Sequence, residues 1–244
     1  MNNNQHWLQP DWPAPPNIHA ATTLRIGGVS LDKYANLNLA THVGDDPELV
    51  DQNRQILISR LNLPSEPIWL HQTHSNLAIK ITATSVPLHG DASYTDEADV
   101  VCAVMTADCL PLLICAADGS EIAAIHAGWR GLLDGIIDNT INALQSRNVL
   151  VWLGPAIGPD CFEVGGEVRA AYLTKSTEYA SAFKQKNEDK WLADIYQLAR
   201  INLSALGISK IFGGNFCTVT DHERFYSYRR DKDTGRMATL IWRD

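Results

Sequence analysis

The stretch from residue 98 to residue 145 constrains the fold more than any other part of this 244-residue sequence. It begins ADVVCAVMTADCLPLLICAADGSEIAAIHAGW, in which three apolar runs have the composition of buried β-strands. Asp118–Gly119 separates the second run from the third, and Asp-Gly is a strong signal for a two-residue β-hairpin turn. The sequence therefore predicts an antiparallel hairpin, preceded by a strand at 100–106 and followed by a helix at 132–144.

The register of this hairpin brings a cysteine and a histidine together. A turn at Asp118–Gly119 places His126 opposite Pro111. Because side chains alternate between the faces of a strand, Cys109 lies diagonal to His126, about 7–8 Å away between backbones. A metal ion can bridge such a pair. Pro111 lacks the N–H that a central strand needs, so we expect the strand to be broken there. The break would hold Asp108 and Cys109 beside the histidine.

A catalytic zinc ion commonly has three protein ligands and one open position, so a third ligand is needed. The segment HQTH offers His71 and His74, which point to opposite faces of an extended chain, and spacing alone does not choose between them. A structural zinc site would be closed by a fourth protein ligand, for which Cys217 is the best candidate. A site completed by Cys217 would favour a non-catalytic interaction protein.

The remaining sequence alternates strand and helix patterns without repeats or linkers. Residues 1–17 contain four prolines and are expected to form an irregular arm, and residues 18–244 are expected to form one domain. Strand patterns occur at 18–26, 67–83, 149–158 and 210–217, helical patterns at 48–63, 163–175 and 194–207, and a closing hairpin is predicted at 225–242. The sequence thus predicts a single-domain α/β (α+β) fold with a mixed β-sheet flanked by helices.

Composition narrows the range of functions. The formal net charge is −8 and the only basic cluster is Arg229–Arg230, so nucleic acid is not an expected partner. No apolar run is long enough to span a bilayer. The polar, proline-rich first residues lack the features of a secretory signal, which predicts a cytoplasmic protein with reduced cysteines. No feature of the sequence indicates an oligomeric state.

Motifs along nearly the whole chain resemble those of one bacterial family. They are RIGGVS, NLNLATHVGDD, QTH, DASY, CAVMTADCLPLL, AAIHAGWRG, LGPAIGP, FEVGGEV, DIYQLAR, IFGG and FYSYRRDKDTGRM. The family is known as laccase-domain protein or polyphenol oxidase, as peptidoglycan editing factor and as zinc-type purine nucleoside phosphorylase. The resemblance implies one α/β domain with a single metal ion held by His74, Cys109 and His126, and it selects His74 over His71.

The resemblance also implies an activity. Members of the family are described as cleaving adenosine, inosine and methylthioadenosine with phosphate, and as deaminating adenosine. The implied metal is zinc, with copper as the alternative. For deamination, a zinc-activated water would attack C6 of the purine, with Asp108 as the candidate proton shuttle. The alternative role of Asp108 is a hydrogen bond within its turn. The signature of the well-known zinc deaminases is absent, so deamination would be an independent solution.

Phosphorolysis also requires sites for phosphate and for ribose. The candidates for the anion site are Arg25, Arg130 and Arg229, each of which has a structural role as its alternative. Asn38 and His42 lie in the long loop after the first strand and are candidates for ribose contacts or for closing that loop.

Two rival reactions come with the same family. A copper polyphenol oxidase would need several coppers with many histidine ligands, whereas the chain has eight histidines and no H-x-H pair. Cytoplasmic editing of a peptidoglycan precursor would use Cys109 as a nucleophile with His126 as its base, or a zinc-activated water.

Overall fold

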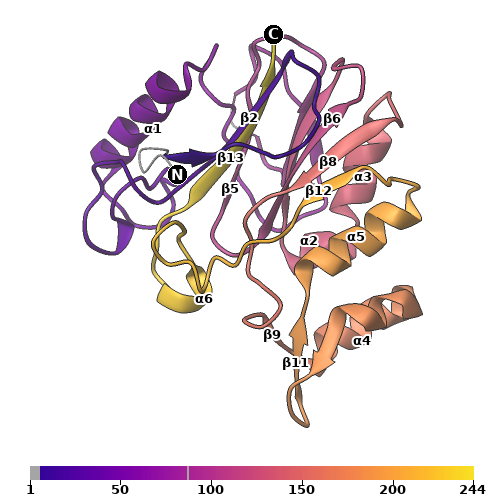
Figure 1. The fold of residues 1–244 in the computed structure, drawn as a ribbon. Coiled ribbons are helices and arrows are strands. Elements are labelled where there is room, and N and C mark those ends of the chain that lie inside the picture. The colour runs from indigo at the N-terminus through magenta and orange to yellow at the C-terminus, as the bar shows by residue number, and fades with distance from the viewer. Residues whose placement is uncertain (1–5, 87) are drawn as a thin grey trace.

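Two β-sheets pack face to face in this protein, and helices cover the outer face of each sheet (Figure 1). The structure is a computed structural model and describes residues 6–86 and 88–244. The mixed α/β single-domain fold that the sequence predicts is confirmed. Part of the predicted arm, residues 1–5, lies outside the described residues. Trp7–Leu8 pairs with the first long strand, and the domain boundary after residue 17 stays a prediction.

The first sheet has four strands in the order β1-β2-β13-β5, and all neighbouring strands are antiparallel. The strands are β1 (Trp7–Leu8), β2 (Ile18–Thr23), β13 (Met237–Arg243) and β5 (Cys102–Thr106). The strand that comes last in the sequence therefore lies in the interior of this sheet, between β2 and β5.

The second sheet has six strands in the order β12-β8-β6-β7-β4-β3. It is mixed, because β12 pairs with β8 and β3 pairs with β4 in parallel, whereas the other pairs are antiparallel. The strands are β12 (Ile211–Gly213), β8 (Val149–Leu153), β6 (Leu110–Ala116), β7 (Ile122–Ala127), β4 (Ala92–Thr95) and β3 (Ala78–Lys80).

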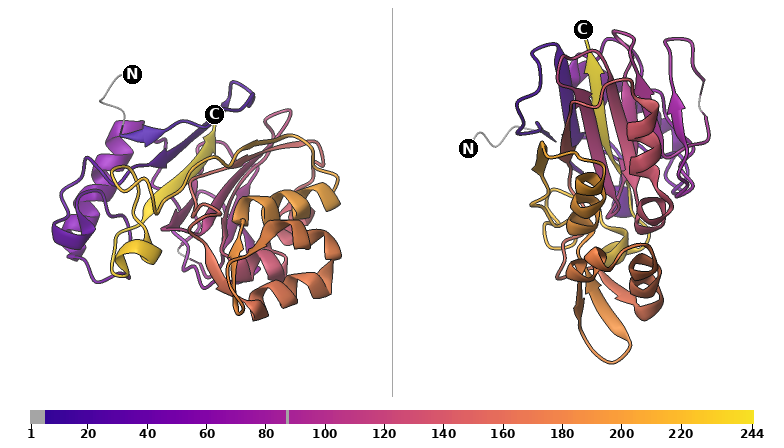
Figure 2. Two further views of the ribbon diagram at one scale, coloured as in Figure 1. Left: turned by 60° about the horizontal axis from the view of Figure 1, so that its bottom comes forward. Right: turned by 90° about the vertical axis from the view of Figure 1, so that its right-hand side faces the viewer.

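A third, smaller sheet projects from one end of the molecule together with α4 (Figure 2). Its strands are β10 (Phe183–Gln185), β11 (Lys190–Ala193) and β9 (Glu163–Gly165). The α-helices are α1 (Pro47–Leu61), α2 (Trp129–Asp134), α3 (Ile136–Ala143), α4 (Gly166–Lys175), α5 (Ile195–Ala205) and α6 (Tyr228–Asp231). Two 3-10 helices, η1 (Asp32–Tyr34) and η2 (Thr177–Ala182), complete the described elements.

The central strands of both large sheets are buried on both faces, which explains their nearly continuous apolar sequences. Cys102 and Val104 of β5 point into the core between the sheets, where they meet Leu113 of β6. The alternate residues Ala103 and Met105 belong to the outer core that packs against α1. Helices α3 and α5 cover the opposite side of the second sheet.

The predicted register of the β6–β7 hairpin is confirmed, because Pro111 pairs with His126. The predicted break of the strand at Pro111 is wrong, since β6 runs through this residue. The carbonyl of Pro111 accepts a hydrogen bond from the N–H of Gly154 at 2.9 Å. The Gly154 carbonyl accepts from the Tyr196 hydroxyl at 3.2 Å. This hydroxyl replaces the donor that proline lacks, so the strand continues.

Three other expectations from the sequence are corrected. Segment 225–242 forms no hairpin: α6 lies in its first half and β13 in its second half. The side chain of Ser227 caps α6 by accepting a hydrogen bond from Arg230 N at 3.2 Å, which favours a helix over a strand. Segment 67–83 is a strand only at β3. The helix predicted at 132–144 is divided at Gly135, whose φ is 90°.

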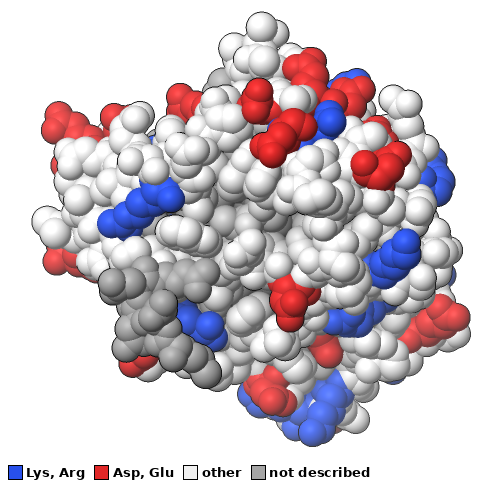
Figure 3. Space-filling view, turned by 45° about the horizontal axis from the view of Figure 1, so that its top comes forward, with Lys and Arg blue, Asp and Glu red and all other residues white. Residues whose placement is uncertain are grey.

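Among the described residues, no helix has the length and apolar character needed to cross a bilayer. The face in Figure 3 carries Lys and Arg interspersed with Asp and Glu, and the basic residues do not merge into one patch there.

Candidate metal centre and its cavity

Three side chains from different parts of the sequence converge at one end of the second sheet. Donor atoms of His74, Cys109 and His126 all lie within 4.8 Å of one another. The Sγ of Cys109 is 3.6 Å from Nε2 of His74. A tetrahedral ion with the usual Zn–S and Zn–N bond lengths separates such atoms by about 3.6 Å. The donor set therefore fits a metal ion of the zinc type.

His126 and Cys109 are positioned by the β6–β7 hairpin. His126 lies near the end of β7, and Cys109 directly precedes β6. The interruption expected in this region lies just before the strand, at residues 107–109, where Asp108 has a φ of 92°. A left-handed conformation is uncommon for a residue other than glycine and needs support from its surroundings. The Asp108 carbonyl accepts from Ile157 N at 2.9 Å, which supplies part of that support.

The side chain of Gln72 fixes the loop that carries the third donor. Its amide nitrogen donates to the carbonyl of Met105 at 2.8 Å, and its amide oxygen accepts from Met105 N at 2.7 Å. The side chain thus makes the pair of bonds that a neighbouring strand would make to β5. Two residues later, His74 has a φ of 60° and turns away from an extended path. This explains why the QTH segment is not a strand.

A buried carboxylate, Asp91, joins this loop to the hairpin. It accepts hydrogen bonds from the backbone N–H groups of residues 73–75, from the Ser75 hydroxyl and from Nδ1 of His126 at 2.7 Å. Burial alone would raise the pKa of Asp91, but the bonds from His126 and Ser75 outweigh it and lower the pKa to about 2. Because Nδ1 of His126 is held by Asp91, Nε2 is left to face the donor group.

Close approach of backbone to the donor group requires glycine at position 128. A Cβ at Gly128 would lie 2.7 Å from Cδ2 of His74 and 3.1 Å from Sγ of Cys109. The backbone of Gly128 has φ −67°, which other residues adopt readily. The glycine is therefore needed for the space that it leaves to the donors.

The donors also influence one another electrostatically. Burial opposes the thiolate of Cys109, but the neighbouring His126 and His74 outweigh it and lower the pKa of Cys109 to about 6. Burial likewise opposes the charged form of His126, whereas Cys109 and Asp91 raise the pKa of His126 to about 9. Without a metal ion, thiolate and imidazolium stabilise each other. A metal ion needs the thiolate and the neutral imidazole, so its binding releases a proton from His126.

The donor group opens into a cavity of about 460 Å³. Apart from the three donors, its walls include the carboxylate of Asp108, two arginines and three aromatic rings: Arg229, Arg236, Trp129, Phe162 and Tyr228. A largely apolar cavity of this size with a few polar groups is typical of sites for small molecules.

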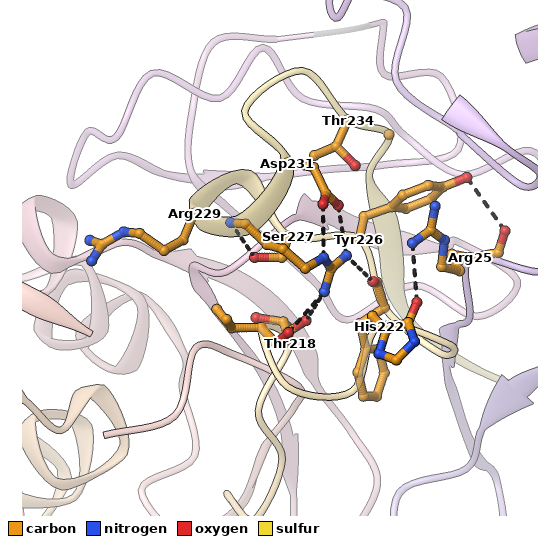
Figure 4. Close-up of polar contacts among 12 residues, drawn as sticks. Arg25, Thr218, His222, Tyr226, Ser227, Arg229, Asp231 and Thr234 are labelled. Carbon is orange, nitrogen blue, oxygen red and sulfur yellow. Dashed lines mark hydrogen bonds and ion pairs between the residues drawn. The ribbon is translucent and has the colours of Figure 1, made fainter. Parts of the chain in front are cut away.

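Of the predicted substrate-binding residues, His42 and Arg229 line this cavity. Burial and the nearby Arg236 lower the pKa of His42. The Nη1 atom of Arg229 donates to the carbonyl of Glu163 at 3.1 Å, and its backbone N–H donates to Oδ2 of Asp108 at 2.6 Å. In Figure 4 the side chain of Arg229 extends away from the cluster around Thr218.

Three other candidates lie outside the cavity walls. Arg25 donates to carbonyls of residues 35 and 222 and packs 4.9 Å from the ring centre of Tyr226. Figure 4 shows Arg25 beside Tyr226 and His222. Asn38 is fully buried, and its amide bonds to Ala40 and to the N–H of Arg236. Arg130 is exposed and stacks on Trp129, 4.2 Å from a ring centre.

Sequence reasoning did not single out Asp91 or Arg236 as site residues. Both lie in the motifs DASY and FYSYRRDKDTGRM, so membership of a shared motif was the available signal. Cys217, the candidate fourth ligand, lies in the wall of a different cavity. Within residues 6–86 and 88–244, the one metal-binding group of His, Cys, Asp or Glu contains only His74, Cys109 and His126.

The fold and the site together define the class: a mixed α/β domain with one His–Cys–His donor group open to a cavity. The model of the family described as multi-copper polyphenol oxidoreductase laccase matches residues 19–244, and the chain belongs to this family. The resemblance found in the motifs is thereby confirmed.

Curated relatives carry a different description. The chain is 52% identical to purine nucleoside phosphorylase YfiH of Escherichia coli (strain K12) over 238 residues, which is 96% of this chain and 98% of the relative. It is 49% identical to a Pseudomonas aeruginosa protein also named purine nucleoside phosphorylase, over 97% of this chain and 98% of that protein. These names support an enzyme.

Solved structures share the fold over its whole length. A Neisseria meningitidis crystal structure superposes with a TM-score of 0.95 at 47% identity and covers 98% of this chain and 100% of that chain. The crystal structure of YlmD from Geobacillus stearothermophilus superposes with a TM-score of 0.92 at 29% identity, covering 100% of this chain and 98% of that chain.

Proposed function

We propose that this chain is a metal-dependent purine nucleoside phosphorylase that cleaves adenosine, inosine and methylthioadenosine with phosphate. The observation that carries the proposal is the opening of the three metal-binding side chains onto a cavity that two arginines also line. The names of the relatives support the same reaction. A nucleoside and phosphate are the partners that this cavity is proposed to take.

His74, Cys109 and His126 would hold the metal ion, which we propose to be zinc, with copper as the alternative. Two imidazoles and a thiolate suit both metals. When bound, the ion supplies a Lewis acid for negative charge that develops during the reaction. The several coppers of a multi-copper oxidase would need more donor groups than the single group found among the described residues.

Arg229 and Arg236 are proposed to bind phosphate. Both line the cavity, and guanidinium groups bind phosphate oxygens with two parallel hydrogen bonds. Burial lowers the pKa of Arg236, although the nearby Cys109 and Asp108 oppose this effect. An anion beside Arg236 compensates the cost of burying the guanidinium.

The nucleoside is proposed to lie between the aromatic walls and the metal group, which is the donor group of His74, Cys109 and His126. Trp129, Phe162 and Tyr228 offer faces on which a purine can stack. Thr106 lines the same cavity. His42 is the proposed contact for ribose.

In the proposed reaction a phosphate oxygen attacks C1′ of the ribose while the C1′–N9 bond breaks. The bonding electrons pass to N9 of the purine, which takes up the proton that the hydrogen phosphate gives up. Asp108 is proposed to hold two segments beside the cavity in place. Its Oδ1 accepts from the Thr218 hydroxyl at 2.5 Å, and its Oδ2 accepts from Arg229 N at 2.6 Å. Adenosine deamination would use Asp108 for proton transfer instead.

The test is to incubate metal-loaded protein with adenosine, inosine or methylthioadenosine, with and without phosphate, and to separate the products by chromatography. We expect free base and ribose 1-phosphate, or its methylthio derivative, only when phosphate is present. Cys109→Ala should reduce both metal content and turnover to background, whereas the exposed Arg130→Ala serves as a matched control that retains both.

The same incubations distinguish the alternatives. Inosine formed from adenosine without phosphate would establish deamination. No turnover of any nucleoside by a metal-loaded sample would refute the proposal and direct the search to amide bonds of cell-wall precursors. Oxidation of a phenol by a copper-loaded sample would favour the polyphenol oxidase.

A further inference from the structure

A second cavity, of about 550 Å³, lies on the other side of the loop that follows β8. Gly158 and Cys161 of this loop line the second cavity, whereas Ile157 and Phe162 line the cavity of the metal group. Cys217 comes from the segment after β12 and lines the second cavity as well. The loop is therefore a shared wall, with two cysteines on its far side.

Cys161 and Cys217 are both half-buried and line the same cavity. The N–H of Cys161 donates to the carbonyl of Gly158 at 3.0 Å, so Gly158 links the two cysteines. The N–H of Gly158 donates to Sγ of Cys217 at 3.3 Å. A Cβ at Gly158 would lie 3.0 Å from the same sulfur, so backbone packs directly against it. Both cysteines thus lie at the wall of one open cavity, on either side of Gly158.

The surroundings of the two sulfurs give them different chemistry. Burial opposes the thiolate of Cys217, but hydrogen bonds from Thr220, Gly158 and Val219 outweigh it and lower its pKa. Burial and the neighbouring Cys217 raise the pKa of Cys161. Cys217 is therefore suited to be the attacking thiolate and Cys161 to be the thiol that follows. Cys102 and Cys115, by contrast, are fully buried and enclosed by apolar residues.

We propose that Cys217 and Cys161 form a thiol–disulfide exchange site for low-molecular-weight disulfides. The Cys217 thiolate attacks one sulfur of the external disulfide, whose S–S bond breaks and releases one thiolate. Cys161 then gives its proton to that thiolate and attacks Sγ of Cys217, which releases the second half as a thiolate. The external disulfide is reduced to two thiols while the two cysteines are oxidised to a disulfide.

The backbone around this thiol pair reaches the metal cavity. Thr218, which follows Cys217, donates to Oδ1 of Asp108 at 2.5 Å. The carbonyl of Cys161 accepts from Nη1 of Arg229 at 3.4 Å. A disulfide requires Cβ atoms about 3.5–4.5 Å apart, so its formation fixes the spacing of the two segments that hold these residues.

The test uses the metal-loaded full chain and glutathione disulfide as the probe, with intact mass and peptide mapping as readouts. The wild-type protein should lose two hydrogens and yield a cross-linked peptide that joins residues 161 and 217. Cys161→Ser should instead accumulate one glutathione on Cys217, because the second step is blocked. Cys217→Ser should leave Cys161 unmodified.

Peptide mapping of the wild type alone can overturn the proposal if a substitution prevents folding. The proposal fails if Cys217 of the folded protein stays reduced at a concentration of glutathione disulfide that modifies Cys102 and Cys115 once the protein is unfolded. It also fails if the disulfide partner of Cys217 is not Cys161. Equal modification of Cys161 in the Cys217→Ser variant would also contradict the proposed order of attack. These readouts do not involve nucleosides, so their outcome is independent of the proposed function.

Discussion

Among single residues, Asp91 has the largest share in shaping the metal group. Its carboxylate is fully buried and bonds both to the loop that carries His74 and to the ring of His126. One side chain therefore sets the spacing of two donors that lie far apart in the sequence. Hydrogen bonds of this kind to the far nitrogen of a metal-binding histidine also raise its basicity as a ligand.

Asp91→Asn should destabilise the fold in a pH-dependent way. Because the pKa of Asp91 falls from the ordinary 3.8 to about 2 on folding, its ionised form stabilises the native state above about pH 4. That contribution is lost as the pH falls from about 4 to 2. We expect a loss of about 3 kcal/mol in the free energy of unfolding at pH 7, measured by denaturant titration.

The difference between wild type and Asp91→Asn should shrink steadily as the titrations are repeated toward pH 3. Asp118→Asn, which changes an exposed carboxylate in the hairpin turn, is the control and should have little effect on stability. A difference that does not change with pH would contradict the assignment.

Cys109 should be reactive at unusually low pH once the metal has been removed. Because His126 and His74 lower its pKa to about 6, the rate of alkylation by iodoacetamide in the chelator-treated protein should rise with a midpoint near pH 6. His126→Gln removes the positive charge that most lowers the pKa of Cys109. The midpoint should therefore move up toward the ordinary 9.0. Peptide mapping identifies the alkylated cysteine, and an unchanged midpoint in the variant would show that the histidine is not the cause.

At the scale of elements, the start of α2 fits closely against the metal group. Gly128→Ala adds one methyl group where His74 and Cys109 leave no room for it. We expect metal affinity to fall about 10- to 100-fold, as for other changes that displace metal ligands, although every ligand is retained. Competition with a chromogenic chelator measures the affinity.

Gly166→Ala is the matched control for this substitution. The site is also the start of a helix, and the nearest atom to an added Cβ is 3.9 Å away. Its metal affinity should match that of the wild type. Equal affinities for Gly128→Ala and the control would mean that the donor group tolerates displacement.

The segment between α6 and β13 brings Arg236 to the cavity, where it is proposed to bind phosphate. Arg236→Ala should raise the KM for phosphate about 10-fold or more, since charge-assisted hydrogen bonds to the anion are lost. The KM for the nucleoside should change much less. Arg130→Ala removes an arginine outside the cavity wall, so steady-state kinetics of this variant should match the wild type.

The sequence predicts those parts of the site that depend on local signals. The Asp118–Gly119 signal predicts the register that brings Cys109 beside His126, and the observed pairing has this register. Asp91 escapes prediction because each of its bonds reaches a residue at least 16 positions away. Single-sequence patterns carry no information on such contacts.

The same distinction explains the errors in the fold. Pro111 remains within β6 because Tyr196, 42 residues after Gly154, supplies the missing hydrogen bond. Segment 225–242 has the alternation of a hairpin, but Ser227 and Asp108 bond the N–H groups at the start of α6 and favour a helix there. In both cases a side chain distant in sequence contributes, Tyr196 at Pro111 and Asp108 at α6, and in the second case the local cap Ser227 acts with it.

For the whole molecule, the metal group connects loops that belong to different sheets. Gln72 bonds to β5 of the first sheet, while Cys109 and His126 adjoin strands of the second. Removing the metal should therefore lower the melting temperature of the entire domain. For a 244-residue chain at a free metal concentration of about 100 times Kd, we expect a decrease of about 5–10 °C.

Calorimetry with and without a chelator measures this change, and Cys109→Ala provides the control. The variant should show little response to the chelator because a ligand is already missing. If both proteins respond equally, the chelator acts elsewhere on the fold.

The interior position of β13 determines when the first sheet can form during synthesis. Residues 237–243 lie between β2 and β5, so both of these strands carry unpaired edges on the ribosome until β13 has been made. Met105 bonds to Gln72 and so holds the loop of His74, and it lies in β5, one of the two strands with an unpaired edge. A chain that ends before residue 237 therefore contains all three metal donors, but β5, to which Gln72 anchors the loop of His74, lacks its neighbour β13.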